Sequence, residues 1–240
     1  MKETVVVAGL GEVGRPLFRV LSGAFDCTGI DIEPVEIETP CSVLHICFPY
    51  QIGGFVGVTA DYIRSIRPAL TIIHTSVPPG TTRQVQDAVP NYLIAYSPVR
   101  GKHARMQDDM LRYKKFVAAP RQEALGAALD HLSTAGFHVS TLSSPELAEL
   151  AKLLETTYLG VLIAWTQEME RMAAQYGGTF NDVNSLVEEV AYLPSHIYPG
   201  VIGGHCVLPN IDLLRARIDS KFLDLVVESN ALKSQLLSAA

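Results

Sequence analysis

Two kinds of segment alternate over the first 143 residues of the chain. Short, continuous apolar runs, typical of strands buried on both faces, are separated by stretches whose apolar residues recur at helical spacing. The strand-like runs cover residues 4–8, 27–30, 42–49, 70–75, 92–96, 115–119 and 137–141, and the clearest helical stretches follow Gly14, include residues 62–66 and cover residues 122–134. This order predicts an α/β fold with a mostly parallel, doubly wound sheet, whose ligands gather at the carboxyl ends of the strands.

Helical periodicity takes over at Ser144, a residue suited to cap a helix, and Pro145 after it is favoured at the first helical position. The apolar spacing continues to about Tyr176, which predicts one helix about 45 Å long. Further helices are expected over residues 181–190 and 210–237, with glycine- and proline-bearing loops at 193–204 and near Pro209. The pattern therefore predicts an α/β domain over residues 1–143 and an all-helical domain with a long central helix over residues 144–240.

A Gly-x-Gly-x-x-Gly sequence, formed by Gly9, Gly11 and Gly14, follows the first strand and opens a helix. In such a turn the first glycine bends the chain, the second lets the backbone meet a pyrophosphate, and the third allows close helix–strand packing. The next strand ends in Asp31, which is placed to accept a hydrogen bond from an adenosine ribose hydroxyl and to repel a 2′-phosphate. This order predicts a Rossmann domain that binds NAD in preference to NADP. Further cofactor contacts are expected from Glu12, Val13 and Pro49.

Composition narrows the class of protein. With a net charge of −6 and without a run of lysine and arginine, the chain is not expected to bind nucleic acid or an anionic membrane. Its four cysteines match neither a disulfide framework nor zinc spacing, and no metal is expected. The first strand begins at once and no apolar stretch approaches the ~20 residues that span a bilayer, so we expect a cytoplasmic protein without a signal peptide.

A cysteine in the second domain is the strongest candidate for chemistry. Cys206 follows His205 in a run, residues 198–210, whose three glycines and two prolines predict a tight loop in which the backbone approaches a ligand. A thiol there can act as a nucleophile tuned by His205, or it can be a buried residue of a structural turn. Lys152, flanked by leucine and alanine on the long helix, either points into a site or extends from an apolar face to solvent.

Four segments together resemble one family of enzymes. Residues Gly9–Leu17, His74–Thr82, Ala148–Lys152 and Pro199–Pro209 are similar to motifs of the UDP-glucose/GDP-mannose dehydrogenase family and occur in the same order. The resemblance implies an NAD-dependent, four-electron oxidation of a sugar primary alcohol to an acid. It also implies that the loop cysteine forms a thiohemiacetal, which is oxidised to a thioester and then hydrolysed.

The resemblance assigns roles to individual positions. Cys206 matches the nucleophile, Lys152 matches the lysine that stabilises the oxyanion, and Ser76 falls where the family has the threonine of a Thr-Val-Pro motif beside cofactor and catalytic water. Thr156 and Asn210 stand where the family has an asparagine and an aspartate. Because neither side chain takes a proton from water, we expect the alcohol-to-aldehyde step to survive better than the aldehyde-to-acid step.

Two further departures concern hydrolysis and the substrate. The family's Ser-Pro-Glu motif reads Ser-Pro-Val at residues 97–99, so a carboxylate that acts in catalysis or positions water is missing. Family members continue into a third, Rossmann-like domain, so we expect a short form without that nucleotide-sugar-binding domain. Arg100, Lys102 and His103 follow the same strand end and either hold a phosphate or carboxylate or form a solvated loop. The substrate site is expected to include Gly203, Gly204 and His205.

The remaining residues of note have structural interpretations. His45 and His74 lie inside strand runs and are expected to be hydrogen-bonded core residues. Glu149 and Glu155 are expected to be solvated helix charges. An apolar face of the long helix predicts a packing stripe and a homodimer interface, and its members are Trp165, Met169 and Met172.

The sequence therefore predicts a two-domain, NAD-dependent dehydrogenase of a nucleotide sugar or phosphosugar. In this interpretation Cys206 and Lys152 converge on the nicotinamide end of the cofactor site. Two alternatives stay open. A β-hydroxyacid dehydrogenase shares the Rossmann domain and a helix lysine but needs no thiol, and a non-catalytic NAD-binding dimer keeps the fold without the chemistry.

Overall fold

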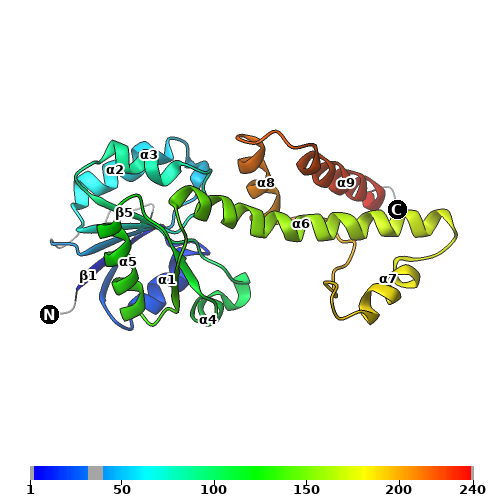
Figure 1. Ribbon diagram of the computed structural model, residues 1–240, viewed down its shortest axis with the longest axis horizontal. Coiled ribbons are helices and arrows are strands. Elements are labelled where there is room, and N and C mark those ends of the chain that lie inside the picture. The colour runs from blue at the N-terminus through cyan, green and yellow to red at the C-terminus, as the bar shows by residue number, and fades with distance from the viewer. Residues whose placement is uncertain (1–2, 32–39, 239–240) are drawn as a thin grey trace. The chain divides into compact units, whose positions relative to one another are not determined.

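The computed structural model describes residues 3–31 and 40–238 (Figure 1). Its internal contacts divide the chain into two compact units, residues 1–152 and 153–240, and the division falls inside the long helix. The sequence pattern places a boundary at residue 144, where that helix begins. The two divisions differ because the first turns of the helix pack within the first unit, where Ala148 joins the core.

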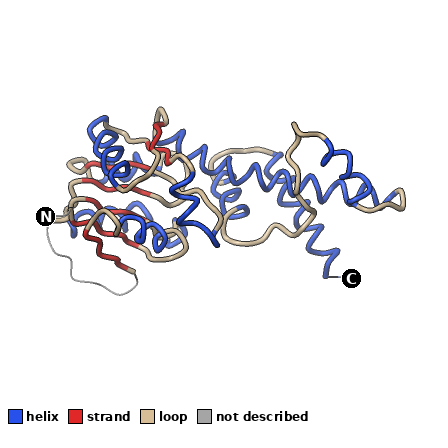
Figure 2. The backbone as a smooth tube through the Cα atoms, turned by 90° about the horizontal axis from the view of Figure 1, so that it is seen from below, coloured by secondary structure: helices blue, strands red, loops and turns tan. Residues whose placement is uncertain are grey.

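The first unit contains a parallel sheet of five strands in the order β2-β1-β3-β4-β5 (Figure 2). The strands are β1 Thr4–Ala8, β2 Asp26–Ile30, β3 Val43–Ile46, β4 Leu70–Ile73 and β5 Leu93–Tyr96. Every neighbouring pair is parallel, so all the carboxyl ends lie along one edge. The predicted α/β class with a parallel sheet is confirmed.

Helices cover both faces of this sheet because alternate side chains of a strand point to opposite sides. The helices are α1 Gly14–Leu21, α2 Phe55–Ile66, α3 Thr81–Ala88, α4 Met106–Arg112 and α5 Gln122–Thr134, with short 3₁₀ turns η1 Tyr50–Ile52 and η2 His103–Arg105. Val5 and Val7 of β1 pack in a cluster with α1, α4 and α5. Val6 and Ala8 pack in a second cluster with α2 and α3. The apolar runs are therefore strands buried on both faces, as a doubly wound sheet requires.

The last two strand runs of this unit lie outside the main sheet. They form β6 (Lys115–Val117) and β7 (Val139–Thr141), which pair in parallel with each other. Ala118, directly after β6, makes an isolated antiparallel bridge to Tyr96 of β5, with N···O distances of 2.8 and 3.0 Å. Because the chain runs against β5 at this bridge, β6 does not extend the parallel ladder.

The second unit is helical. Its elements are most of α6 (Pro145–Gln175), α7 (Phe180–Glu189), α8 (Val207–Arg215) and α9 (Lys221–Ser238). The predicted start of α6 is confirmed, since Pro145 occupies its first position and the Ser144 hydroxyl accepts a hydrogen bond from the Leu147 N–H at 3.3 Å. Among the described residues, no helix is both long and apolar enough to cross a membrane.

The helix predicted over residues 210–237 is two helices, α8 and α9, separated by residues 216–220. Asp219 and Ser220 precede α9, and such short polar side chains compete with the helical backbone and favour helix starts. Pro209, expected in a loop, lies in the first turn of α8, where the missing N–H has no helical partner to lose. The sequence prediction was wrong at both points.

Close packing between α6 and α8 depends on Gly160. A Cβ at this position would lie 2.6 Å from Cγ1 of Val207 and 3.6 Å from Cγ1 of Val226 on α9. A buried hydrogen bond from the Ser229 hydroxyl to Gln167 Oε1, 2.9 Å long, joins α9 to α6 in the same unit. The helices of this unit are therefore connected by polar as well as apolar contacts.

Candidate functional site

The glycine turn after β1 has the close-packed geometry that its sequence predicts. Gly9 has a φ of 91°, and a Cβ there would lie 2.6 Å from the backbone nitrogen of Phe48. A Cβ on Gly14 would lie 1.7 Å from the Gly9 carbonyl oxygen, whereas a Cβ on Gly11 would meet no described protein atom within 4 Å. The turn is thus tightly packed on one side and open at Gly11, which fits a cradle for a phosphate at a helix N-terminus.

The strand ends beside this turn hold the other residues predicted to contact the cofactor. The Gly9 N–H donates to the Ile30 carbonyl at 2.8 Å, so the end of β2 lies beside the glycines, and exposed Asp31 follows directly. Exposed Pro49 comes after β3 and half-buried Ser76 after β4. Because the strands are parallel, all three residues lie toward the same edge of the sheet as the turn.

Glu12 and Val13 lie in the turn itself, and Val13 directly precedes α1. The Glu12 carboxylate, more than half exposed, lies 3.4 Å from Nδ1 of His103, the first residue of η2. A residue predicted to bind the cofactor and one predicted to bind the substrate are therefore neighbours.

The other two predicted anion-binding residues contact their own loop. The Arg100 guanidinium donates to the Lys114 carbonyl at 2.7 Å and lies over the Phe116 ring, 5.1 Å from its centroid. Lys102 is exposed, and its backbone N–H donates to the buried Asp109 carboxylate at 3.0 Å. These contacts order the segment after β5, and anion binding by Arg100 and Lys102 stays a prediction.

Glu149 is fully buried, so the prediction of a solvated helix charge was wrong for this residue. Its carboxylate accepts hydrogen bonds from the Gly80 N–H at 2.6 Å, the Thr82 N–H at 2.7 Å and the Thr82 hydroxyl at 2.6 Å. These donors stand at the N-terminus of α3, which favours a negative charge. Burial raises the pKa of Glu149, and the hydrogen bonds from Thr82 and Gly80 oppose that rise. The start of α6 is thereby fastened to α3, three residues before half-buried Lys152, while Glu155 is exposed as predicted.

Two residues that the sequence analysis did not single out hold the loop before α8. The Asn230 side chain accepts a hydrogen bond from the Ile202 N–H at 2.6 Å and donates one to the Ile202 carbonyl at 3.1 Å. The Gln167 amide donates to the Gly200 carbonyl at 2.7 Å. Both side chains are buried, on α9 and α6. An amide at a position of the apolar helical pattern is the signal that could have found them.

Cys206 is the residue directly before α8, at the end of this anchored loop. It is exposed, as are residues 203–205, so the alternative of a buried cysteine in a structural turn is wrong. Gly204 has a φ of 78°, which explains a glycine at that position. The buried cysteines are Cys41 and Cys47, where burial raises the thiol pKa to about 11 and about 12.

Thr156 and Asn210 meet within the second unit. The Asn210 amide donates to the Thr156 hydroxyl oxygen at 2.7 Å, and its backbone N–H donates to the Cys206 carbonyl at 3.2 Å. Two of the positions at which the chain departs from the family motifs therefore contact each other, one helical turn from the cysteine. Lys152 belongs to the first unit and Cys206 to the second, and their convergence stays a prediction.

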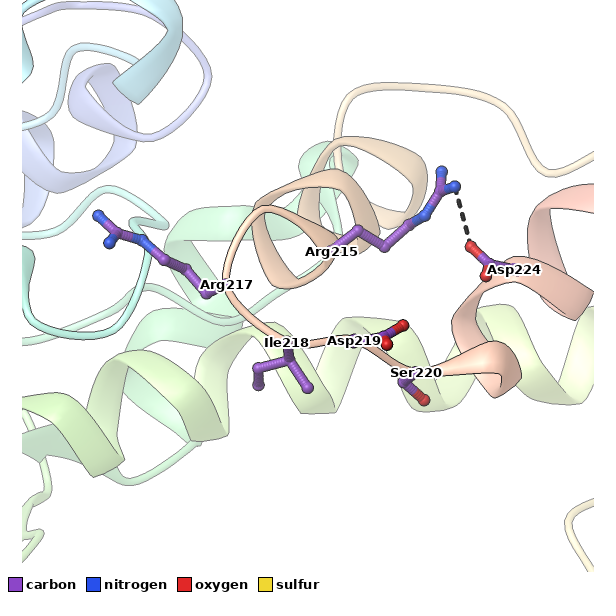
Figure 3. Close-up of a pocket in the computed structure, with 6 residues that line it drawn as sticks. All are labelled: Arg215, Arg217, Ile218, Asp219, Ser220 and Asp224. Atoms are coloured by element: carbon purple, nitrogen blue, oxygen red, sulfur yellow. Dashed lines mark ion pairs between the residues drawn. The ribbon is translucent and has the colours of Figure 1, made fainter.

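A surface depression lies at the turn between α8 and α9 (Figure 3). It is lined by Arg215, Arg217, Ile218, Asp219, Ser220 and Asp224. Arg215 pairs with Asp224 at 2.9 Å, and Arg217 points away from that pair. Its described lining contains none of the residues predicted for cofactor, substrate or catalysis.

Comparisons with known proteins agree with the resemblance. Residues 146–233 match the central domain of the UDP-glucose/GDP-mannose dehydrogenase family. UDP-N-acetyl-D-mannosamine dehydrogenase of Pyrococcus horikoshii is 26% identical over 230 residues, which cover 88% of this chain and 54% of the relative. A UDP-D-ManNAc dehydrogenase structure from Pyrococcus horikoshii matches with a TM-score of 0.86 at 19% identity, covering 98% of this chain and 70% of that one. A 3-hydroxyisobutyrate dehydrogenase structure from Mycobacterium tuberculosis matches with a TM-score of 0.73 at 16% identity, covering 99% and 94%.

The parallel sheet, the glycine turn and the long helix define a Rossmann-fold protein with a helical second unit. The chain is similar to members of the UDP-glucose/GDP-mannose dehydrogenase family over most of its length. It spans about half the length of the curated relatives it matches. At their level of identity, the structural matches show the fold alone.

Proposed function

We propose that this chain is an NAD-dependent dehydrogenase that oxidises the primary alcohol of a nucleotide sugar. The observation that carries the proposal is the family match over residues 146–233, because this segment contains Lys152, Thr156, Cys206 and Asn210. Three curated relatives of the chain are named for UDP-N-acetyl-D-mannosamine, so UDP-linked N-acetylhexosamines are the substrates to test first.

The glycine turn supports NAD as the cofactor. Gly9 and Gly14 have no room for a side chain and Gly11 is open, so backbone N–H groups at the start of α1 can meet a pyrophosphate. Exposed Asp31 at the end of β2 supports binding of the adenosine ribose and a preference for NAD over NADP. When bound, NAD accepts one hydride in each of two oxidations.

In the proposed reaction the substrate hydroxyl loses its proton as hydride leaves the carbon, and the Lys152 ammonium stabilises the developing oxyanion. The Cys206 thiol then adds to the aldehyde carbon and its proton passes to the carbonyl oxygen, giving a thiohemiacetal. Loss of a second hydride and of the hydroxyl proton gives a thioester. Water cleaves the C–S bond and releases the acid and the thiol. Thr156 and Asn210 hold water by hydrogen bonds but do not take its proton, so hydrolysis is the slow step.

The test follows NADH formation and product mass with a panel of UDP-sugars. We expect aldehyde to form faster than acid, and Cys206→Ser to lose acid formation more completely than aldehyde formation. Cys27→Ser is the matched control, because Cys27 lies on β2 outside the predicted catalytic set. Acid formation that survives in Cys206→Ser would overturn the assignment of the nucleophile.

A second candidate is a β-hydroxyacid dehydrogenase that needs no thiol. It is favoured by the likeness in fold to 3-hydroxyisobutyrate dehydrogenase, of which this chain covers 94%. Alkylation of exposed Cys206 by iodoacetamide separates the two functions, because only the thiol-dependent reaction is lost. A protein that binds NAD but turns over no alcohol in the panel is instead the non-catalytic binding module.

We also propose a homodimer formed through α6, in a cytoplasmic protein. Large apolar side chains on the part of α6 within the second unit are 44–57% exposed, and they are Leu154, Tyr158, Leu159, Trp165 and Met172. Such a patch is typical of a surface that a second copy covers. The four cysteines, which match no disulfide framework, support a reducing compartment.

A further inference from the structure

Four buried ionisable side chains form a hydrogen-bonded row inside the first unit. The histidine row consists of Lys115 on β6, His74 directly after β4, His45 on β3 and His131 on α5, each at most 6% exposed. His45 and His74 are hydrogen-bonded core residues, as predicted. Their extension to a buried lysine at one end and to a third histidine at the other was not predicted.

The row is continuous from Lys115 to His131. The Lys115 Nζ atom lies 3.1 Å from His74 Nδ1, His74 Nε2 lies 2.8 Å from His45 Nδ1, and His45 Nε2 lies 3.0 Å from His131 Nε2. The remaining nitrogen, His131 Nδ1, is buried and makes no hydrogen bond within the described residues. It lies 3.7 Å from the carboxylate of Glu3, whose side chain is 58% exposed, so a small movement of that carboxylate or one water closes the gap. The row therefore runs from a buried lysine to within 3.7 Å of a carboxylate at the surface.

The three imidazoles are neutral near pH 7. Burial lowers the pKa of His45 and His74 well below the usual value, and the neighbouring Lys115 and histidines lower them further. Burial also lowers the pKa of His131, to about 4. Each ring consequently carries one proton, on either Nδ1 or Nε2.

Lys115 changes its charge in the same range of pH. Burial is the main cause that lowers the pKa of Lys115 to about 7. Repulsion by Lys152 and Arg100 lowers this pKa further, whereas attraction by Cys47 raises it. The ammonium form has three N–H groups and three acceptors, namely the Ser97 carbonyl at 2.7 Å, the Pro98 carbonyl at 3.0 Å and His74 Nδ1. In the amine form His74 Nδ1 is free to carry a proton, which it donates to the Ser97 carbonyl at 2.7 Å.

The charge of Lys115 thereby determines the tautomer of every ring. When the ammonium donates to His74 Nδ1, His74 and His45 carry their protons on Nε2, and His131 carries its proton on Nδ1, facing Glu3. When Lys115 is an amine, His74 and His45 carry their protons on Nδ1, and His131 carries its proton on Nε2. With neutral rings, these are the two assignments that place one proton in each hydrogen bond between the imidazoles. The amine form favours the second, because a proton on His74 Nδ1 turns its 2.7 Å contact with the Ser97 carbonyl into a hydrogen bond.

We propose that the histidine row is a proton-transfer chain between Lys115 and the protein surface at Glu3. Lys115 gives a proton to His74 Nδ1 as His74 gives its Nε2 proton to His45 Nδ1. His45 gives its Nε2 proton to His131 Nε2, and His131 gives its Nδ1 proton to the Glu3 carboxylate, which releases it to water. One proton leaves, the ammonium becomes an amine, and each imidazole stays neutral with its tautomer exchanged.

The Lys115 end of the row lies at the edge of the main sheet where the carboxyl ends of the strands meet. Lys115 holds the carbonyls of Ser97 and Pro98, directly after β5, and it is close enough to Lys152 for the two charges to repel. The proposal rests on these residues alone and does not depend on the dehydrogenase activity. A purely structural network differs from it in one measurable way, because such a network keeps a single set of tautomers at every pH.

The experiment records the tautomers of ¹⁵N-histidine-labelled, full-length protein by NMR as the pH is raised from about 5.5 to about 8.5. We expect the signals of His74, His45 and His131 to exchange tautomers together, with one midpoint near 7, the pKa of Lys115. His131 should change in the opposite sense to the other two rings. Tautomers that do not change, or rings that titrate one by one to imidazolium in this range, would overturn the proposal.

A lysine variant identifies the source of the proton. Lys115→Met should lock the row at all pH values with His74 protonated on Nδ1, because only the Ser97 carbonyl remains as its partner. Lys114→Met, which changes the exposed neighbouring lysine, should keep the concerted change. A change in tautomers that persists in folded Lys115→Met would overturn the role of Lys115, and the titration of the unchanged protein decides the proposal if that variant does not fold.

Discussion

Replacing Glu149 measures how strongly the start of α6 is fastened to α3. Glu149→Ala removes a buried carboxylate that accepts three hydrogen bonds, from the N–H of Gly80 and from the N–H and hydroxyl of Thr82. Hydrogen bonds to a charged group contribute roughly 1.5–3 kcal/mol each. The variant also removes the cost of burying the carboxylate, which is what raises the pKa of Glu149. The net loss of stability is therefore smaller than the summed contributions of the three hydrogen bonds. We expect the free energy of unfolding to fall by roughly 3–5 kcal/mol, which is less than the sum of three such hydrogen bonds.

Glu146→Ala is the matched control for this variant. Glu146 lies one turn earlier on α6 and pairs with Arg83 of α3 at 2.5 Å, where the two side chains are 32% and 51% exposed. Exposed ion pairs of this kind contribute roughly 0–1 kcal/mol. Urea denaturation followed by far-ultraviolet circular dichroism compares both variants with the unchanged protein. If Glu149→Ala destabilises no more than Glu146→Ala, the buried carboxylate does not hold the two helices together and the reasoning fails.

Three further changes test the cofactor turn and the assembly. Gly14→Ala places a Cβ 1.7 Å from the Gly9 carbonyl oxygen and should lower the Tm. Gly11→Ala should keep the Tm and weaken only NAD binding, measured by calorimetry. Normal NAD affinity in Gly11→Ala would contradict the proposed phosphate cradle at the glycine turn. Asp31→Ala should bind NAD more weakly and discriminate less against NADP, and an unchanged protein that binds NADP as tightly as NAD would refute this use of Asp31. Light scattering at micromolar concentration should give the mass of a dimer. Trp165→Ser removes an indole that is 55% exposed and should shift the mass toward that of the monomer. A monomeric mass for the unchanged protein would contradict the proposed dimer.

Elements that depend on neighbours in the sequence could be predicted. Gly14 identifies the turn because a Cβ there would lie 1.7 Å from the carbonyl oxygen of Gly9, five residues earlier, and Gly9 has a φ of 91° that favours glycine. Ser144 and Pro145 mark the start of α6 through hydrogen bonding and φ restriction within one helical turn. The break between α8 and α9 was missed because apolar spacing continues across residues 216–220, and two short polar residues are a weak local signal against it.

Local sequence patterns thus predicted the strand runs, the glycine turn and the long helix, and four motifs carried the resemblance to a dehydrogenase family. Which charged and polar side chains are buried could not be predicted, because burial depends on packing between segments that are far apart in the chain. Glu149 and Glu155 look alike on one helix, but Glu149 meets donors 67 and 69 residues earlier and is enclosed by them. His45 likewise contacts His131, 86 residues later, and a strand pattern shows that a histidine is inside without showing its partner. Periodicity tells which residues share a face, and packing alone determines what covers that face.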